Sequence, residues 1–399
     1  MHVQFGSIGR FPRPDLERTI RQARRPQAPR ALGKAARERH HEEDVYMSTL
    51  KPLAACLFLI FSGHALAANT ALQDQEGIDN EAVIEQFNGD GNLAEQIQSG
   101  TRNHSVISQD GSDNTAYVEQ AGEQNQAKVD QVGNLNSASI QQVDYDNLGE
   151  ITQLGDGNQA VLWQGQQGEP YLTNGSSAVL YQEGNNNSVK VDQIWYRNNL
   201  TVSSIGDNND VQVTQGGFSD IDVAQVGNDN IANIVHQAAG AGSVMSLEQT
   251  GNGNVASMSQ TGGARNNPGS ARLQQKGDNN RADIAQTGHF NEVDFSQEGT
   301  GNELDVVQGG ERIVFTGSST GDFNRAEIDQ GASDAYLELT QVGSENVAKV
   351  DQEAYQGEAQ ISQIGTANQV TLMQASSAVA PSASVMQNGS GNQATITQR

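Results

Sequence analysis

Small, apolar and polar residues alternate along this chain in short runs that return every eleven residues. Between positions 109 and 142 the sequence QDGSDNTAYVEQAGEQNQAKVDQVGNLNSASIQQ repeats the unit Q-x-G-x-x-N-x-A-x-Φ-x, in which Φ is a branched aliphatic residue. In the part N-x-A-x-Φ-x-Q the four named positions are two residues apart, so they share one face of an extended strand. The residues between them are mostly polar. Each unit therefore predicts one strand of about seven residues with an inward face and a polar outward face.

The residues between Gln and Asn in each unit predict a tight turn. They are rich in Gly, Asp and Asn, as in LGDGN at 154–158, and these residue types tolerate the positive φ angles that tight turns need. The glycines that we assign to these turns are Gly111, Gly122, Gly133, Gly155, Gly343 and Gly389.

An eleven-residue period also fits a helix that supercoils to the right. A Gly and an Asn in nearly every unit would each weaken a helix, and no continuous apolar stripe accompanies them. We therefore expect strands, and the chain should be all-β.

One unit cannot fold alone, because it buries only one Ala and one larger aliphatic side chain. Stacked at roughly 4.8 Å, each inward aliphatic, Gln and Asn would meet its counterpart in the next coil, where amides can hydrogen bond along the axis. The expected fold is an amyloid-like β-solenoid of stacked strand-turn-strand coils built from 11-residue half-repeats, and the sequence leaves open whether a coil holds two strands or three. The predicted ladder and self-assembly residues are Gln109, Asn114, Gln120, Asn125, Gln131, Asn136, Gln142, Gln153, Asn158, Gln341, Asn346, Gln352, Gln387, Asn392 and Gln398.

The repeat frame runs from Gln75 to Gln398 and holds 29 anchor positions. All are Gln except three, which are Ser204, His236 and Ser319. Three of the irregular intervals contain Pro170, Pro268 and Pro381, the only prolines after residue 67. Proline cannot donate to a central ladder, so these interruptions predict loops that bulge from one edge of a continuous solenoid.

The first 67 residues have a different character. Residues 47–67 read MSTLKPLAACLFLIFSGHALA and resemble a secretory signal peptide, with cleavage expected between Ala67 and Ala68. Residues 1–46 are rich in arginine and are interpreted as a gene-model extension or an unusual leader. Cys56 also allows an alternative in which the chain is cleaved and lipidated there. A short mature segment, 68–74, would then precede the repeat solenoid at 75–398.

Charge and composition exclude some classes of binding partner. The net charge is −25, and residues 1–67 hold 11 of the 23 basic and 6 of the 48 acidic residues, so the remainder carries about −30. Nucleic acid is therefore not an expected partner, and like charge would keep copies apart in solution. No cysteine follows residue 67, so no disulfide is expected in the mature chain. No apolar run after residue 67 approaches the length of a membrane span.

Catalytic and metal-binding patterns are not found. His104, His236 and His289 lie in different units without a second ligand at metal spacing, and we interpret them as solvated or turn residues. The acidic turns do not complete a calcium loop, and no acidic cluster marks the active site of an enzyme. The expectation is a protein that is not an enzyme, with no cofactor, no metal and no small-molecule substrate.

The unit with its closing glutamine, seen at 153–164 (QLGDGNQAVLWQ), 341–352 and 387–398, resembles the curlin repeat of bacterial curli fibres. The resemblance covers nearly all of residues 75–398, with many more repeats than a typical curlin. It implies a secreted functional-amyloid subunit, major or nucleating, in extracellular fibres that serve cell adhesion and the biofilm matrix. It also implies a solenoid with two strands per coil, inward Gln, Asn and aliphatic residues, and export through the periplasm by outer-membrane curli-type secretion machinery.

Two functional classes remain open at this point. One is a subunit that assembles with itself head to tail, and with other curlin subunits, into a cell-surface fibre. The other is a monomeric β-solenoid adhesin, which would need a cap over each terminal strand. Regular repeat continues to Gln398 and starts near the expected cleavage site, without an obvious cap, so the sequence favours assembly.

Overall fold

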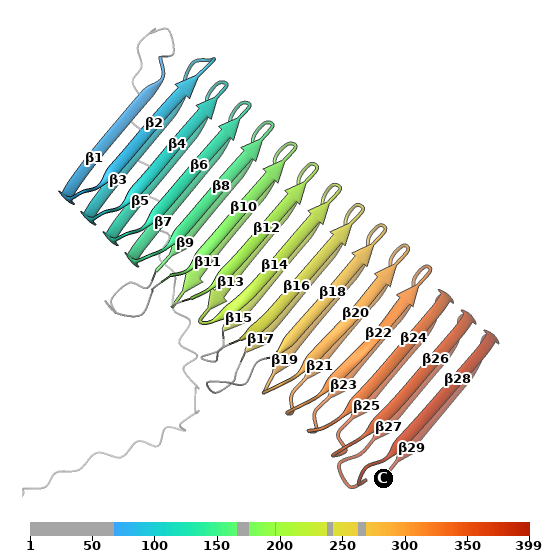
Figure 1. Cartoon of the computed structure of the whole chain (residues 1–399). Helices are drawn as coiled ribbons and strands as arrows, with labels where there is room; N and C mark the ends of the chain where they lie inside the picture. The colour runs from blue at the N-terminus through green and yellow to red at the C-terminus, as the bar shows by residue number, and fades with distance from the viewer. Residues whose placement is uncertain (1–67, 166–174, 196, 238–241, 262–268) are drawn as a thin grey trace, which may run out of the picture. The chain divides into compact units, whose positions relative to one another are not determined.

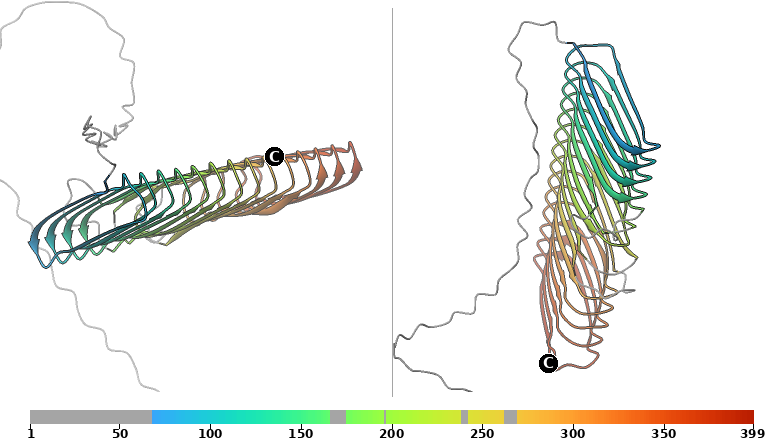
Figure 2. Two further views of the ribbon diagram at one scale, coloured as in Figure 1. Left: turned by 90° about the horizontal axis from the view of Figure 1, so that it is seen from above. Right: turned by 90° about the vertical axis from the view of Figure 1, so that its left-hand side faces the viewer.

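The computed structural model describes residues 68–165, 175–195, 197–237, 242–261 and 269–399. Every helix or strand in these residues is a β-strand, and the 29 strands form two parallel sheets (Figure 1). Odd-numbered strands form one sheet and even-numbered strands the other, so the chain changes sheet after each strand. The protein is a β-solenoid of about 14 turns with two strands per coil. Two further views show the coils following one another along the solenoid (Figure 2).

The 15-stranded sheet contains, in spatial order, β1 (Thr70–Ile78), β3 (Leu93–Thr101), β5 (Thr115–Glu123), β7 (Ser137–Tyr145), β9 (Gln159–Gln164), β11 (Ser188–Ile194), β13 (Asp210–Gly216), β15 (Ile231–Gln237), β17 (Val255–Thr261), β19 (Arg281–Thr287), β21 (Glu303–Gln308), β23 (Arg325–Gln330), β25 (Val347–Gln352), β27 (Gln369–Gln374) and β29 (Gln393–Gln398). The 14-stranded sheet contains β2 (Glu81–Phe87), β4 (His104–Asp110), β6 (Gln126–Val132), β8 (Leu148–Leu154), β10 (Ser177–Glu183), β12 (Asn199–Ile205), β14 (Ser219–Val226), β16 (Ser243–Thr250), β18 (Ser270–Lys276), β20 (Glu292–Glu298), β22 (Val314–Thr320), β24 (Tyr336–Ser344), β26 (Glu358–Thr366) and β28 (Ser382–Ser390).

The register of the strands follows the repeat frame. β4 pairs with β6 so that Gln109 lies on Gln131, and each described strand carries one of the 29 anchor positions. Side chains at alternate positions are buried, as in β6, where the buried residues separate exposed or half-buried ones. The predicted all-β solenoid is therefore confirmed, and the strand alternation is the physical basis of its inward and outward faces.

The core is a column of aliphatic side chains between the two sheets. Val118, Ile140 and Leu162 stack in register on β5, β7 and β9 and are completely buried. Each such side chain contributes about 1.5–3 kcal/mol through removal from water. The column has one aromatic exception, in which the rings of Phe295 and Phe315 stack with their centroids 5.2 Å apart. Gly317, in register with Phe295, leaves the space that this pair needs.

The predicted turn glycines adopt conformations that other residues avoid. Gly122 has φ of 126°, and a Cβ atom at this position would meet the backbone carbonyl of Asp144 in the next coil. Close stacking and positive φ thus act together to require glycine. The residue two positions further on, Gln124, also has a positive φ of 59°.

The interruptions occur at one edge of the solenoid. Those with Pro170, Pro268 and Pro381 each connect a strand of the 15-stranded sheet to the next strand of the 14-stranded sheet. Pro170 and Pro268 themselves lie outside the described residues. Pro381 is buried at a position that Asn holds in regular units, and its carbonyl accepts a hydrogen bond from the backbone N–H of Glu358 at 2.9 Å. Ladder continuity at Pro381 therefore needs only the carbonyl, which proline retains.

Candidate self-assembly surfaces

Many interior anchor glutamines join neighbouring coils and the two sheets. Gln120 accepts a hydrogen bond from Nε2 of Gln98 at 2.8 Å and donates its own Nε2 to Oε1 of Gln142 at 2.8 Å. The same Nε2 also donates to the backbone carbonyl of His104, on the opposite sheet, at 3.0 Å. All three glutamines are buried. An unpaired buried amide group would cost about 1–3 kcal/mol, so a glutamine in one coil favours a glutamine in the next.

The asparagines form a second ladder at the ends of the turns. Oδ1 of Asn114 accepts a hydrogen bond from the backbone N–H of Asn136 at 3.0 Å, one coil further on. Its Nδ2 donates to the carbonyl of Gly133 at 2.8 Å. Each such amide replaces backbone partners that a turn cannot supply, and so fixes the turn to its successor.

The structure places the predicted ladder residues on the inner face of the strands or at the ends of turns. Those with at most 1% of their surface exposed are Gln109, Asn114, Gln120, Asn125, Gln131, Asn136, Gln142, Gln153, Asn158, Gln341, Asn346 and Gln352. Gln387, Asn392 and Gln398 belong to the last coil, where Gln387 is buried, Gln398 half-buried and Asn392 exposed. The predicted turn residues, with φ between 112° and 126°, are Gly111, Gly122, Gly133, Gly155, Gly343 and Gly389. Ala68 is exposed at the start of the described chain, and Ala67 lies outside it.

A third ladder, which the sequence reasoning missed, follows the outer surface of the turns after the even-numbered strands. The backbone N–H of Asn134 donates to Oδ1 of Asp156 at 2.8 Å, and that of Asp156 donates to Oδ1 of Asn185 at 3.2 Å. The signal was an Asp or Asn directly after the turn glycine, as in GDGN and GDNN. These residues were interpreted only as turn formers, although the short side chains also connect coils.

The three anchors that are not glutamine interrupt the ladder to different degrees. Ser319 donates its hydroxyl to Oε1 of Gln341 at 2.7 Å and so continues the ladder below it. Ser204 lies in register between Gln182 and Gln225, and Oε1 of Gln225 has no hydrogen-bond partner among the described residues. The short serine side chain therefore leaves the ladder connections to both neighbouring glutamines unmade.

The interpretation of His236 as a solvated or turn residue was wrong. Its side chain is completely buried on β15, in the anchor position between Gln215 and Gln260. Nδ1 lies 2.8 Å from the backbone carbonyl of Gly216, which fixes the proton on Nδ1. Nε2 of His236 and Oε1 of Gln260 are buried without partners in the described part of the chain. Burial lowers the pKa of His236 from its ordinary value of 6.5, because the charged ring is poorly solvated there.

The ladder has a direction, and its two ends differ. Gln75 and Gln86 donate through Nε2 to the next coil, but their Oε1 atoms accept no hydrogen bond from a described residue. At the other end, Oε1 of Gln387 and of Gln398 is occupied, and Nε2 of each donates only to a backbone carbonyl. One end therefore offers acceptors, the other offers donors.

The terminal strands also have open edges. Each of β1, β2, β28 and β29 has a strand partner on one side only within the described structure. Their free edges carry backbone N–H and C=O groups that could pair with another strand.

On the outer faces some charged side chains form ion pairs between neighbouring coils, and others lie close to side chains of like charge. Arg325 bonds Glu303 at 2.9 Å, and Lys349 bonds Glu327 at 2.6 Å, each across one coil. These pairs are exposed, so each is worth at most about 1 kcal/mol. The pKa of Asp305 is raised, first by burial and then by neighbouring carboxylates, so stacked acids oppose the packing of coils.

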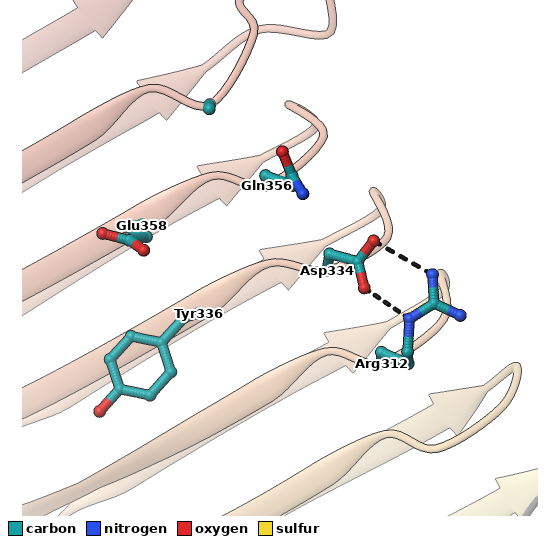
Figure 3. A pocket seen from close by; sticks show the side chains of 6 residues that line it. Arg312, Asp334, Tyr336, Gln356 and Glu358 are labelled. Atoms are coloured by element: carbon teal, nitrogen blue, oxygen red, sulfur yellow. Dashed lines mark hydrogen bonds and ion pairs between the residues drawn. The ribbon is translucent and has the colours of Figure 1, made fainter.

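An open groove lies near the C-terminal end of the 14-stranded sheet (Figure 3). Arg312 forms a bidentate pair with Asp334, with Nε–Oδ1 and Nη2–Oδ2 distances of 2.5 and 3.1 Å. This pairing lowers the pKa of Asp334. Tyr336 and Glu358 point away from the pair (Figure 3). The Arg312–Asp334 pair links two coils at their turns.

In the described ranges no group of three or more His, Cys, Asp or Glu side chains is placed to hold a metal ion. The same part of the chain has no helix with the length and apolar character required to cross a bilayer.

The fold and the ladders define a repetitive β-solenoid whose interior is held by stacked side-chain amides. The family model of the curlin associated repeat matches residues 89–122 and 277–310, which cover parts of two separate sets of coils. These matches support the resemblance to the curlin repeat in those two segments of the chain. A search of curated proteins finds no match to it.

Proposed function

We propose that this protein is a secreted structural subunit that polymerises end to end into curli-like functional amyloid fibres. The curlin repeat and the solenoid fold fit such a subunit. In this role it would serve cell adhesion and the biofilm matrix, as fibre subunit or as nucleator, alone or with other curlin subunits.

The observation that carries the proposal is the complementarity of the two ends. The acceptors Gln75 and Gln86 at one end match the donors Gln387 and Gln398 at the other. A contact between unlike ends does not close on itself, so it propagates as a filament. In such a filament every coil would have partners on both sides, as in cross-β structures.

Export is part of the same proposal. The segment 47–67 would direct the chain to the periplasm, outer-membrane curli-type machinery would release it at the cell surface, and the mature chain would begin at Ala68. N-terminal sequencing of the protein recovered outside the cell tests this step. A mature start at a lipid-bearing Cys56 would instead tie the protein to a membrane.

Electron microscopy and fibre diffraction of the purified protein after incubation test the function. We expect unbranched fibres with a reflection at about 4.7–4.8 Å along the axis, because parallel strands stack at that spacing. Isolated rods one solenoid long, with no fibres at any concentration, would favour the monomeric adhesin instead.

A further inference from the structure

The turn after the first strand matches the turn after the last strand of the other sheet, and this match determines how two copies can meet. Residues 75–80 after β1 (QEGIDN) and residues 387–392 after β28 (QNGSGN) share the order Q-x-G-x-x-N. The turn after β1 contains Gly77 and Asp79 with φ of 120° and 55°. The turn after β28 contains Gly389 and Gly391 with φ of 114° and 67°. A rotation by half a coil therefore superimposes turns of the same length and backbone conformation.

The described solenoid contains an odd number of strands. It begins with β1 and ends with β29, and both belong to the 15-stranded sheet. If a second copy stacked without rotation, its β1 would pair with β29, and one strand position would stay empty between β28 and the second copy's β2. That gap would be about 4.8 Å high and would expose the aliphatic column to water.

We propose that successive subunits in the fibre are related by a rotation of half a coil, so that β1 of the next copy pairs with β28 and its β2 pairs with β29. This inference rests on the proposed fibre function. With this rotation neither sheet has an empty strand position at the junction, and the 15-stranded sheet of one subunit continues as the 14-stranded sheet of the next. The partner of the free edges of β28 and β29 is thus a second copy of this chain.

Side chains at the two edges match in this arrangement. Continuing the observed register places Gln387 on Gln75 of the next copy, donor to acceptor, and Gln398 on Gln86 of the next copy. It also places Ile396 on Ile84 of the next copy, so two half-buried aliphatic residues cover each other.

The junction without rotation gives a poorer match. It would set Ile396 against the amide of Gln73 of the next copy and leave Ile84 of that copy uncovered. The half-coil junction has two costs. Val385 would lie against the amide of Gln73 of the next copy, and Pro381 cannot supply the Asn amide oxygen that would accept from the backbone N–H of Asn69 of the next copy.

The rotation predicts a visible alternation along the fibre. All three proline-containing interruptions come, in the sequence, between a strand of the 15-stranded sheet and the next strand of the 14-stranded sheet. In successive subunits these turns would lie on opposite edges of the fibre. The structural repeat of the fibre would therefore be two subunits.

Disulfide trapping between two single-cysteine chains tests the junction. Each chain is expressed from the full-length sequence with Cys56→Ser, so that only the introduced thiol reacts. Outward positions that pair across a parallel ladder lie about 4.8 Å apart, within the range that a disulfide spans. Fibres grown from a mixture of D74C and M386C chains, and from a mixture of E85C and T397C chains, should each cross-link on mild oxidation.

A third mixture, D74C with T397C, reports the junction without rotation and should not cross-link. A chain carrying both S362C and M386C is the control for reactivity, because these positions are register partners within one molecule. Cross-linking in the third mixture but not in the first two would overturn the half-coil junction while leaving the fibre intact. Fibres in which only the control cross-links would overturn end-to-end pairing in register. If fibres do not form from the C56S chain, the proposed function itself fails.

Discussion

Gln98 and Gln120 lie one coil apart, and Nε2 of the first donates to Oε1 of the second at 2.8 Å in the interior of the solenoid. The same donation recurs along both sheets, always from the earlier coil to the later one, as in Gln352 to Gln374 at 2.9 Å. A ladder of this kind has a donor end and an acceptor end. The direction of the amides, together with the open strand edges, is the physical basis of our proposal of end-to-end growth.

Removing one amide from the ladder should destabilise the solenoid. Gln131→Leu would leave the donor of Gln109, the acceptor of Gln153 and the carbonyl of Thr115 without their partner. We expect the free energy of unfolding to fall by about 2–4 kcal/mol, since several buried groups lose a hydrogen bond together. Urea unfolding of the soluble chain measures it. Gln126→Leu, an exposed position on the same strand, is the matched control and should change stability by less than about 0.5 kcal/mol.

A charge should be tolerated on the outer face and not on the inner one. Val129→Asp would bury an unpaired carboxylate in the aliphatic column, where the native side chain has no exposed surface. A loss of about 3–5 kcal/mol is expected. Lys128→Asp changes an exposed position on the same strand. Circular dichroism during thermal unfolding compares the two variants, and equal melting temperatures would contradict the assignment of the faces.

Replacing a turn glycine by alanine should destabilise the solenoid. In Gly122→Ala the methyl group would press on the carbonyl of Asp144, in a backbone conformation with φ of 126°. The expected cost is about 1–3 kcal/mol. Gly331→Ala is the control, because a Cβ atom there has no neighbour within 4 Å and the φ angle is not strained. If both variants unfold at the same denaturant concentration, the close contact between turns does not exist.

His236→Gln should stabilise the protein and reduce its sensitivity to acid. The buried ring has a pKa below its ordinary 6.5. As the pH falls below 6.5, His236 is therefore protonated in the unfolded chain before it is protonated in the folded one. Stability is therefore lost as pH falls from 6.5 towards the lower folded pKa. Glutamine at this position would remove the pH-dependent loss. It would also complete the ladder between Gln215 and Gln260, which should raise the free energy of unfolding by about 1 kcal/mol at neutral pH.

Unfolding curves of wild type and the His236→Gln variant between pH 7 and pH 5 measure both effects. His104→Gln, at a half-buried outward position, is the control for loss of a histidine. A stability difference between His236→Gln and wild type that does not change with pH would show that His236 is not buried in its neutral form.

Much of the fold follows from the repeat. Each anchor between Gln75 and Gln398 predicts one strand, and the alternation around Val129 predicts which side chains are buried, because strand periodicity is local. The repeat frame alone left the number of strands per coil open, although alternate units differ in their turns: the order G-x-x-N is kept after nearly every even-numbered strand and after few odd-numbered ones. The pairing of Phe295 with the space above Gly317 depends on residues one coil apart, and only the register reveals it.

The candidate site was predictable to a similar degree. Gln and Asn at fixed spacing indicated ladders, yet the direction of donation and the difference between the two ends required the orientation of each amide. His236 was misplaced because histidine is usually polar and exposed, although the repeat frame already put it at an inward anchor. The Asn134 and Asp156 ladder was missed because turn chemistry alone explained these residues.

Seeded growth tests whether the solenoids polymerise end to end. Wild-type protein is incubated while fibre mass is followed by light scattering, with and without sonicated fibres of the same protein. We expect a lag that the seeds abolish, because each fragment presents complete donor and acceptor ends to the next subunit. A protein that remains monomeric for days at high concentration, with a β-rich circular dichroism spectrum and no response to seeds, would contradict it.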